Sequence, residues 1–233
     1  TGVVQAQTLV TGENGSIMLM GDMQSGTVNV GGTLDASAPN GGDGGFIETS
    51  AAHVKVADNT RITTLASTRK TGTWLIDPMD YTVAVGGGDI TGTQLGTNLD
   101  ATSIIIESVE GTAGTLGNVD VNDAVSWTAP TTLTLRAVND VNINVAILGI
   151  NGSSDAQAGN DVNVAAATKT TTGNLSFTTV NDVLISAATT ITTGNLAAVA
   201  GRNVTLATAS TVTTGDMVLW ADDDGTGPGP AAG

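Results

Sequence analysis

The sequence predicts an all-β fold, a parallel β-helix in which the chain completes one coil in about 21 residues, within the range typical of stacked repeats. Three observations predict this fold. The pentapeptide TTGNL occupies 171–175 and again 192–196, and TTGDM follows at 213–217. Between these motifs apolar and polar residues alternate, which is the pattern of half-buried strands. The chain is also rich in glycine and poor in aromatic residues, with 31 glycines and 3% aromatics, which favours strands and turns over helices.

Two strands per repeat share this period. The first begins at a valine, and its members are Val141, Val162, Val183 and Val204. The second begins at Leu175, Leu196 and Met217, and Leu133 lies two periods upstream of Leu175. The intermediate member would begin at Ser154, where SDAQA is polar, so we expect a weak or looped coil there.

Glycine precedes the second strand in three repeats, at Gly173, Gly194 and Gly215. Each glycine is expected to supply a turn with a positive φ. In a stack of such repeats, equivalent residues would lie ~4.8 Å apart, the spacing of paired strands. About 11 coils would give a rod on the order of 50 Å long. A sandwich of antiparallel hairpins also fits the composition, but it does not require a fixed step.

The regularity of the pattern divides the chain into four segments. We expect irregular β-helix coils at 1–73, a junction with further coils at 74–132, regular coils of the period given above at 133–221, and a linker or tail rich in Gly, Pro and Asp at 222–233. Between residues 86 and 99 the rhythm breaks, and the apolar residues there predict either a short helical turn or a loop.

Charge and composition exclude several classes of function. The net charge is −15, with seven Lys plus Arg against 22 Asp plus Glu, so contacts with nucleic acid phosphates or with an anionic membrane surface are not expected. No cysteine is present for disulfides, and no long apolar run predicts a transmembrane segment. His53 is the only histidine and is expected to face solvent. The sequence therefore lacks the His and Cys ligands of a zinc site and a histidine placed for Ser–His catalysis.

Two polar columns precede the valine column. One holds Asp140, Asp161, Asp182 and Asn203, and the other holds Asn139, Asn160 and Asn181. Stacked carboxylates repel unless a cation bridges them, so a calcium ladder on the three aspartates is one hypothesis. The hypothesis we favour is that these residues cap backbone N–H groups at a corner. The asparagines predict a structural amide ladder, and no cofactor is expected.

Three other features invite a functional interpretation. Trp74 in WLIDP could stack on a ligand, but we expect it to fill the core at the junction. Trp127 and Trp220 end strands and are expected to be partly exposed. The ADDDG motif at 221–225 lacks the alternating acids of a calcium loop, so it is interpreted as a solvated linker.

An enzyme is a further alternative, because two carboxylates ~5–9.5 Å apart can hydrolyse a glycosidic bond. Asp120 with Asp123, or Asp77 with Asp80, could meet that distance. The basic residues are scattered, however, and Arg69-Lys70 is the only adjacent pair. We therefore expect no catalytic residues.

Four phrases carry a family resemblance. They are GGDGGFIETSAAHVKV (41–56), GTWLIDPMDYTV (72–83), LDATSIIIES (99–108) and GNVDVNDAVSWTAPTTLTLRAVNDVNINVAI (117–147). In order and spacing they resemble the passenger of filamentous-haemagglutinin-like two-partner-secretion exoproteins of Gram-negative bacteria. The resemblance implies a right-handed parallel β-helix, export through an outer-membrane transporter, and adhesion at the cell surface. The secretion-domain signatures NPNG and NPNL are absent, so we expect an internal segment of the rod or a mature fragment of it.

The expected function is therefore a non-catalytic extracellular rod that adheres to a glycan or protein on a host or neighbouring cell. One alternative is a self-assembling fibre whose ends stack head to tail. A second alternative is a β-helical carbohydrate-active enzyme.

Overall fold

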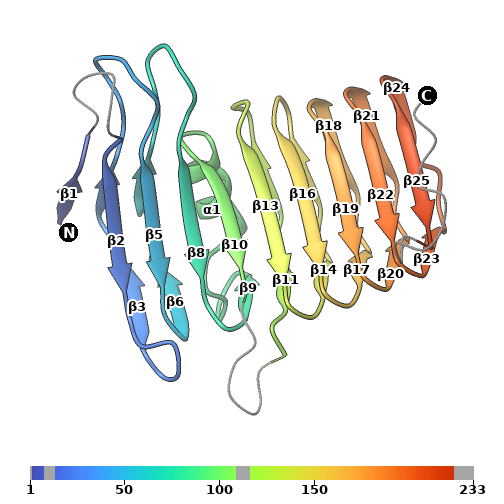
Figure 1. Cartoon of the computed structure of the whole chain (residues 1–233), viewed down its shortest axis with the longest axis horizontal. Coiled ribbons are helices and arrows are strands. Elements are labelled where there is room, and N and C mark those ends of the chain that lie inside the picture. The colour runs from blue at the N-terminus through green and yellow to red at the C-terminus, as the bar shows by residue number, and fades with distance from the viewer. Residues whose placement is uncertain (1, 8–13, 109–115, 223–233) are drawn as a thin grey trace.

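The computed structural model describes residues 2–7, 14–108 and 116–222 of the chain. Within these residues the fold is all-β, with 25 strands, one short helix and only parallel pairing between strands. Figure 1 shows the strands stacked side by side along the longest axis, from β1 at one end to β25 at the other. The predicted all-β fold with parallel sheets is confirmed. No helix among the described residues is long and apolar enough to cross a membrane.

One sheet, here called the main sheet, runs through the whole stack. Its nine strands in spatial order are β2 (Ser16–Met20), β5 (Phe46–Ser50), β8 (Thr73–Asp77), β10 (Ser103–Glu107), β13 (Thr132–Ala137), β16 (Ser153–Ala158), β19 (Leu175–Thr179), β22 (Leu196–Ala200) and β25 (Met217–Ala221). At ~4.8 Å per step, nine strands extend for roughly 38 Å. The described stack therefore has fewer turns than the eleven expected, because its early repeats are longer than the regular ones.

Two further sheets accompany the C-terminal part of the main sheet. The second sheet contains β9 (Tyr81–Val83), β11 (Val119–Val121), β14 (Val141–Ile143), β17 (Val162–Val164), β20 (Asp182–Ile185) and β23 (Asn203–Leu206). The third sheet contains β12 (Val125–Trp127), β15 (Ile147–Gly149), β18 (Thr168–Thr172), β21 (Thr189–Thr193) and β24 (Thr211–Thr214).

Two small sheets occupy the N-terminal part. One pairs β3 (Thr27–Val30) with β6 (His53–Val56), and the other contains β1 (Val3–Gln5), β4 (Thr33–Asp35) and β7 (Arg61–Thr63).

The register of the C-terminal repeats advances by the constant step that the sequence predicts. Val141 pairs with Val162, Val162 with Val183 and Val183 with Val204. In the main sheet, Leu133 pairs with Ser154 and Ser154 with Leu175. Each repeat thus contributes one strand to each of three sheets, and like residues lie over one another.

The strands of the N-terminal repeats also pair with one another, but the number of residues between paired positions is larger there and varies from repeat to repeat. Along the main sheet Ile17 pairs with Ile47, Ile47 with Trp74, Trp74 with Ile104 and Ile104 with Leu133. The additional residues of each step lie in the loops between strands, so the strands of the main sheet stay paired although the loops are longer.

Small branched side chains fill the interior. Phe177 is completely buried and is stacked between Ala156 and Ala198 on the neighbouring strands. Trp74 is also completely buried, as expected of a core residue, and its Nε1 donates to Thr49 Oγ1 at 3.1 Å. A bulky residue is accommodated where the strands above and below it supply smaller ones.

Two further sequence-based expectations are wrong. The SDAQA segment is not a weak coil, because β16 forms a full strand there and Ser154 is buried between two leucines. A parallel ladder bonds backbone to backbone, so a small polar residue does not break it. Trp127 is not a partly exposed edge either, because only 2% of it is accessible and its ring covers Gly149 and Gly152.

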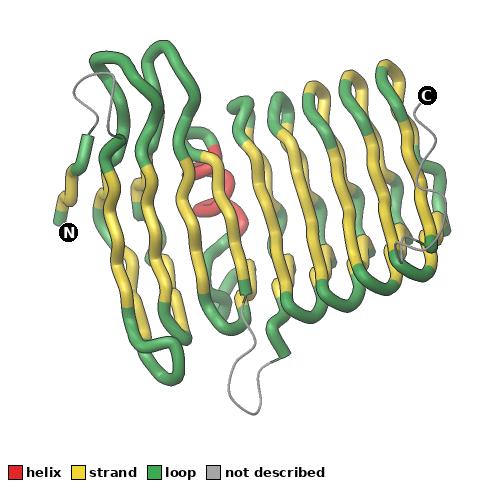
Figure 2. The backbone as a smooth tube through the Cα atoms, viewed as in Figure 1, coloured by secondary structure: helices red, strands yellow, loops and turns green. Residues whose placement is uncertain are grey.

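The helix α1 (Gly92–Leu99) replaces a strand between β7 and β12. Figure 2 shows it within the stack, where the two halves of the molecule meet. Leu95 and Leu99 are completely buried, so of the two alternatives for this segment the helical one is correct. A Cβ on Gly92 or Gly96 would come within 2.2 Å of a carbonyl oxygen beside or in β12, which shows how closely the helix packs there.

Candidate binding surface

The TTGNL motif builds one corner of each regular repeat. Its two threonines are exposed, its glycine turns the chain and its leucine enters the core, as at Leu175 and Leu196. Gly194 has a φ of +138°, and Gly215 has a φ of +133°. A Cβ on Gly194 would lie only 1.8 Å from the carbonyl oxygen of Gly173. Glycine is therefore required by both the turn and the close stacking of corners.

The asparagine of the motif links successive corners. Asn174 Oδ1 accepts from the backbone N–H of Asn195 at 2.9 Å, and Asn195 Oδ1 accepts from that of Asp216 at 2.9 Å. The exposed threonines at this corner form a surface of stacked hydroxyls, here called the threonine array. Its members are Thr171, Thr172, Thr192, Thr193, Thr213 and Thr214.

The predicted aspartate column lies at another corner. Asp140 Oδ1 accepts from the backbone N–H of Asp161 at 3.0 Å, and Asp161 Oδ1 accepts from that of Asp182 at 3.0 Å. Each carboxylate caps the backbone of the next repeat. No cluster of three or more His, Cys, Asp or Glu side chains in the described part of the chain is placed to hold a metal ion. The calcium ladder stays a prediction.

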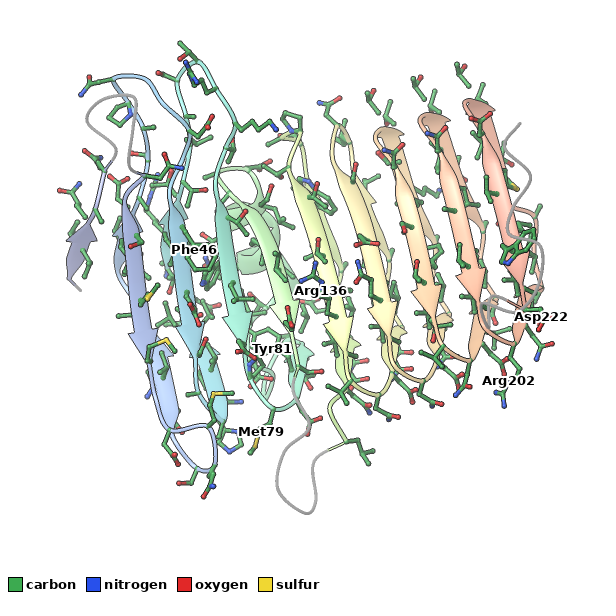
Figure 3. All side chains as sticks on the ribbon, viewed as in Figure 1. Phe46, Met79, Tyr81, Arg136, Arg202 and Asp222 are labelled. Atoms are coloured by element: carbon green, nitrogen blue, oxygen red, sulfur yellow. The ribbon has the colours of Figure 1, made fainter. Side chains whose placement is uncertain are left out.

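Asp182, the last aspartate of the column, is paired with Arg202. Arg202 Nη2 lies 2.6 Å from Asp182 Oδ2, and Asn203 Nδ2 donates to Asp182 Oδ1 at 2.9 Å. The hydrogen bonds from Arg202 lower the pKa of the Asp182 carboxyl. Figure 3 shows Arg202 toward the C-terminal end of the stack.

The predicted asparagine column is only partly a direct amide ladder. Asn181 Nδ2 donates to Asn160 Oδ1 at 2.5 Å, but Asn160 Nδ2 donates to Asp140 Oδ1 at 2.7 Å rather than to Asn139. Asn139 Nδ2 donates instead to Asn118 Oδ1 at 2.8 Å. The two polar columns are therefore cross-linked into one network.

A shallow groove of about 710 Å³ runs along the main sheet over β13, β16 and β19. Arg136, Gln157 and Thr178 are directly in register on these strands and line it. Val180, 65% of which is exposed, lies at its edge. Arg136 Nη1 donates to Glu107 Oε2 at 3.1 Å, and the two side chains are 42% and 41% exposed. Figure 3 places Arg136 near the middle of the sheet.

A group of three carboxylates adjoins this groove on the main sheet. Asp77 lies near Glu107 and Glu48, and one of its oxygens is buried without a hydrogen-bond partner among the described residues. Partial burial, with the negative charges of Glu107 and Glu48, raises the pKa of Asp77 to about 6. Sequence reasoning missed this group because its members come from repeats of unequal length.

The carboxylate pairs considered for hydrolysis have structural partners. Asp123 Oδ2 accepts from the Gly92 N–H at 2.7 Å, Asp80 Oδ1 accepts from the Asn118 N–H at 2.8 Å, and Asp120 Oδ1 accepts from Asn142 Nδ2 at 2.8 Å. Asp77 is the exception among the four. The other three secure α1, β11 and β14.

Comparisons with known proteins give no family assignment: no protein-family model, curated protein or solved structure matches this chain.

Proposed function

We propose that this chain is a segment of a non-catalytic extracellular rod, folded as a right-handed parallel β-helix, that adheres through repeated surface contacts. The observation that carries the proposal is the threonine array, which repeats one exposed motif at a constant step along the stack. Repeated weak contacts reinforce each other when they engage together, so binding strength comes from avidity and needs no deep pocket.

The right-handed closure of the coil is supported by a general rule of chain connection. Successive strands of each sheet are parallel and are joined by segments that visit the other sheets. Crossover connections between parallel strands of one sheet are right-handed in about 98% of cases, because strand twist favours that hand. A stiff stack of this kind would hold adhesive residues away from the cell that bears it.

The proposed location is the surface of a Gram-negative bacterium, after export through an outer-membrane transporter. This part of the proposal comes from the resemblance of roughly residues 40–221 to two-partner-secretion exoproteins. The partner would be a glycan or a protein on a host or neighbouring cell.

Adhesion can be tested by coupling the chain to beads at low and high density and measuring retention on cells under flow. We expect retention only at high density, and at least a tenfold loss when the six threonines of the array are replaced by alanine. The control replaces the exposed Thr27, Thr205 and Thr208, which lie outside the array, and should retain full adhesion. Density-independent retention, or equal retention by both variants, would contradict the proposal.

A self-assembling fibre is the second candidate, and the C-terminal end of the stack favours it. Leu206, Met217 and Leu219 are 37–40% exposed, whereas Ala198, which pairs with Leu219, is completely buried. Among the described residues, β23, β24 and β25 each form the edge of a sheet. Unpaired edges with exposed apolar residues invite parallel pairing with a second copy.

Sedimentation at increasing protein concentration tests the fibre. Growing species that disappear when Leu219 and Leu206 are both replaced by lysine would support it. A single monomeric species at all concentrations would exclude it. Release of reducing sugar from glycans by the purified chain would instead favour the enzyme.

A further inference from the structure

The clearest departure from the repeat creates a hollow beside α1. A cavity of about 500 Å³ lies between α1 and the loop before β7, and Asn59, Arg61, Thr93 and Thr97 help to line it. A smaller hollow of about 200 Å³, lined in part by Asn98, shares Arg61 and Thr97 with it. The two together are called the α1 hollow below. Its size is within the range of small-molecule sites.

Buried amide side chains fix the wall of the α1 hollow. Gln94 is only 6% exposed, and its Oε1 accepts from the Asn59 N–H at 2.7 Å while its Nε2 donates to the Thr60 carbonyl. Asn98 is 2% exposed, and its Oδ1 accepts from the Ile62 N–H at 3.1 Å. These bonds replace the strand-to-strand ladder that β7 lacks on this side, so the wall is held in a defined shape.

Two hydrogen-bond donors at this site have no acceptor within the described part of the chain. Asn98 Nδ2 is buried without a partner among the described residues. Arg61 is exposed and makes no ion pair or side-chain hydrogen bond that involves the described residues. Buried donors are nearly always satisfied, and a guanidinium pairs most strongly with a carboxylate, through two parallel hydrogen bonds. The buried Asn98 Nδ2 calls for an oxygen acceptor, and the exposed Arg61, which water can also satisfy, would pair most strongly with a carboxylate.

Hydroxyls and one acid complete the lining. Thr91 and Thr93 lie on the hollow's helix side, and Asp58, which accepts from Thr91 Oγ1 at 3.4 Å, lies across from them. Such groups exchange hydrogen bonds with hydroxyls. The net charge of −15 disfavours a long polyanion. A short ligand with one carboxylate and several hydroxyls fits both conditions.

We propose that the α1 hollow binds a sugar that carries a carboxylate, such as a uronic acid, with its carboxylate on Arg61. The inference is independent of the adhesive function: the hollow and the threonine array have no residue in common, and either could be correct without the other.

Titration calorimetry with glucuronate and galacturonate, each compared with glucose and galactose, tests the site. We expect saturable binding of at least one acid, and weakening by tenfold or more in Arg61→Gln, because the guanidinium supplies the charge-assisted hydrogen bonds to the carboxylate. Arg69→Gln, another exposed arginine outside the hollow, is the matched control and should bind as the unchanged chain does.

The side-chain amide of Asn98 provides a second readout. Its nitrogen–proton resonance should shift on addition of the bound acid and stay unchanged with the neutral sugar. Absence of binding by both acids, equal binding of acid and neutral sugar, or full binding by Arg61→Gln would each overturn the proposal. Adhesion of coated beads, measured separately, is unaffected by any of these outcomes.

Discussion

The main sheet runs through two regions that are built differently. From Thr132 to Ala221 every step has the same length, and the same corner, a glycine followed by Asn or Asp, returns in the last three repeats. From Ser16 to Glu107 the steps are longer and unequal, and each corner is different. The strand register is equally clear in both regions.

This difference shows what a constant period requires. In the regular region one hydrogen-bond pattern at each corner repeats, as from Asn174 to Asn195 to Asp216. In the N-terminal region each longer loop is held by hydrogen bonds of its own. The clearest are those that the side-chain amides of Gln94 and Asn98 accept from backbone N–H groups. One of these local arrangements borders the α1 hollow and leaves Asn98 Nδ2 without a hydrogen-bond partner among the described residues.

The largest expected effect comes from emptying the core of the regular region. Phe177→Ala should reduce the free energy of unfolding by about 3–5 kcal/mol, because the cavity cannot be filled by the alanines above and below. Urea denaturation measures this change. Thr178→Ala, on the exposed side of the same strand, should change stability by less than about 0.5 kcal/mol. Similar losses in both variants would contradict the assignment of the interior face.

A smaller loss is expected at a stacked corner. Gly194→Ala should cost about 3 kcal/mol, because the new methyl group meets the Gly173 carbonyl and the φ is positive. Gly41→Ala is the matched control in the N-terminal region, since its φ is +112° and nothing lies within 4 Å of the new Cβ. It should cost only about 1 kcal/mol. Equal losses would show that stacking adds nothing to the backbone strain.

Removing the side-chain amide of Gln94 tests whether its hydrogen bonds stabilise the loop that packs against α1. Gln94→Ala should cost about 1–3 kcal/mol, because it leaves the Asn59 N–H and the Thr60 carbonyl without partners. Thr93→Ala on the exposed side of the same helix should be nearly neutral. Thermal melting of both variants makes the comparison, and a neutral Gln94→Ala would show that the amide does not replace the missing strand.

The contributions of Asp77, in the N-terminal region, and of Asp182, in the regular region, to the free energy of unfolding change with pH in opposite directions. Because the pKa of Asp77 is raised to about 6, the folded state binds a proton more tightly there than the unfolded chain. The contribution of Asp77 to stability therefore increases as the pH falls from 7 through 6 toward 3.8, whereas that of Asp182, with its lowered pKa, is lost below 3.8.

Melting temperatures between pH 7 and 4.5 test the Asp77 part. The rise in melting temperature on acidification should be smaller in Asp77→Asn than in the unchanged chain. In Asp182→Asn the rise between pH 7 and 4.5 should equal that of the unchanged chain. An identical profile for Asp77→Asn and the unchanged chain would contradict the assignment.

The smallest expected effect is that of calcium. Melting midpoints with calcium and with a chelator should agree, because the aspartates of the regular region already accept backbone N–H groups. A midpoint that rises with calcium, and no longer does so in Asp161→Asn, would establish the ion ladder instead.

The strand register could be predicted from the sequence where the same residue type recurs at a constant spacing. The valine and leucine positions gave the register of two strands without any structure. Sequence reasoning failed at Ser154 because it judged a single strand by polarity, whereas that strand is held by neighbours on both sides.

It also left the helix undecided. The glycines of TGTQLGTNL resemble a loop, but Gly92 and Gly96 are needed for α1 to approach β12 closely. The acidic group of Glu48, Asp77 and Glu107 was invisible for a related reason. Its members are brought together by steps of unequal length, which no period in the sequence reveals.

The stacking itself can be measured directly in solution. The chain has no cysteine, so pairs of spin labels can be placed on exposed residues that directly follow equivalent strands. Asn122 would be paired in turn with Ala165, Ser186 and Ala207. If the repeats stack regularly, the mean distance increases by about 4.8 Å with each added repeat. Distances that do not increase in equal steps would contradict this stacking.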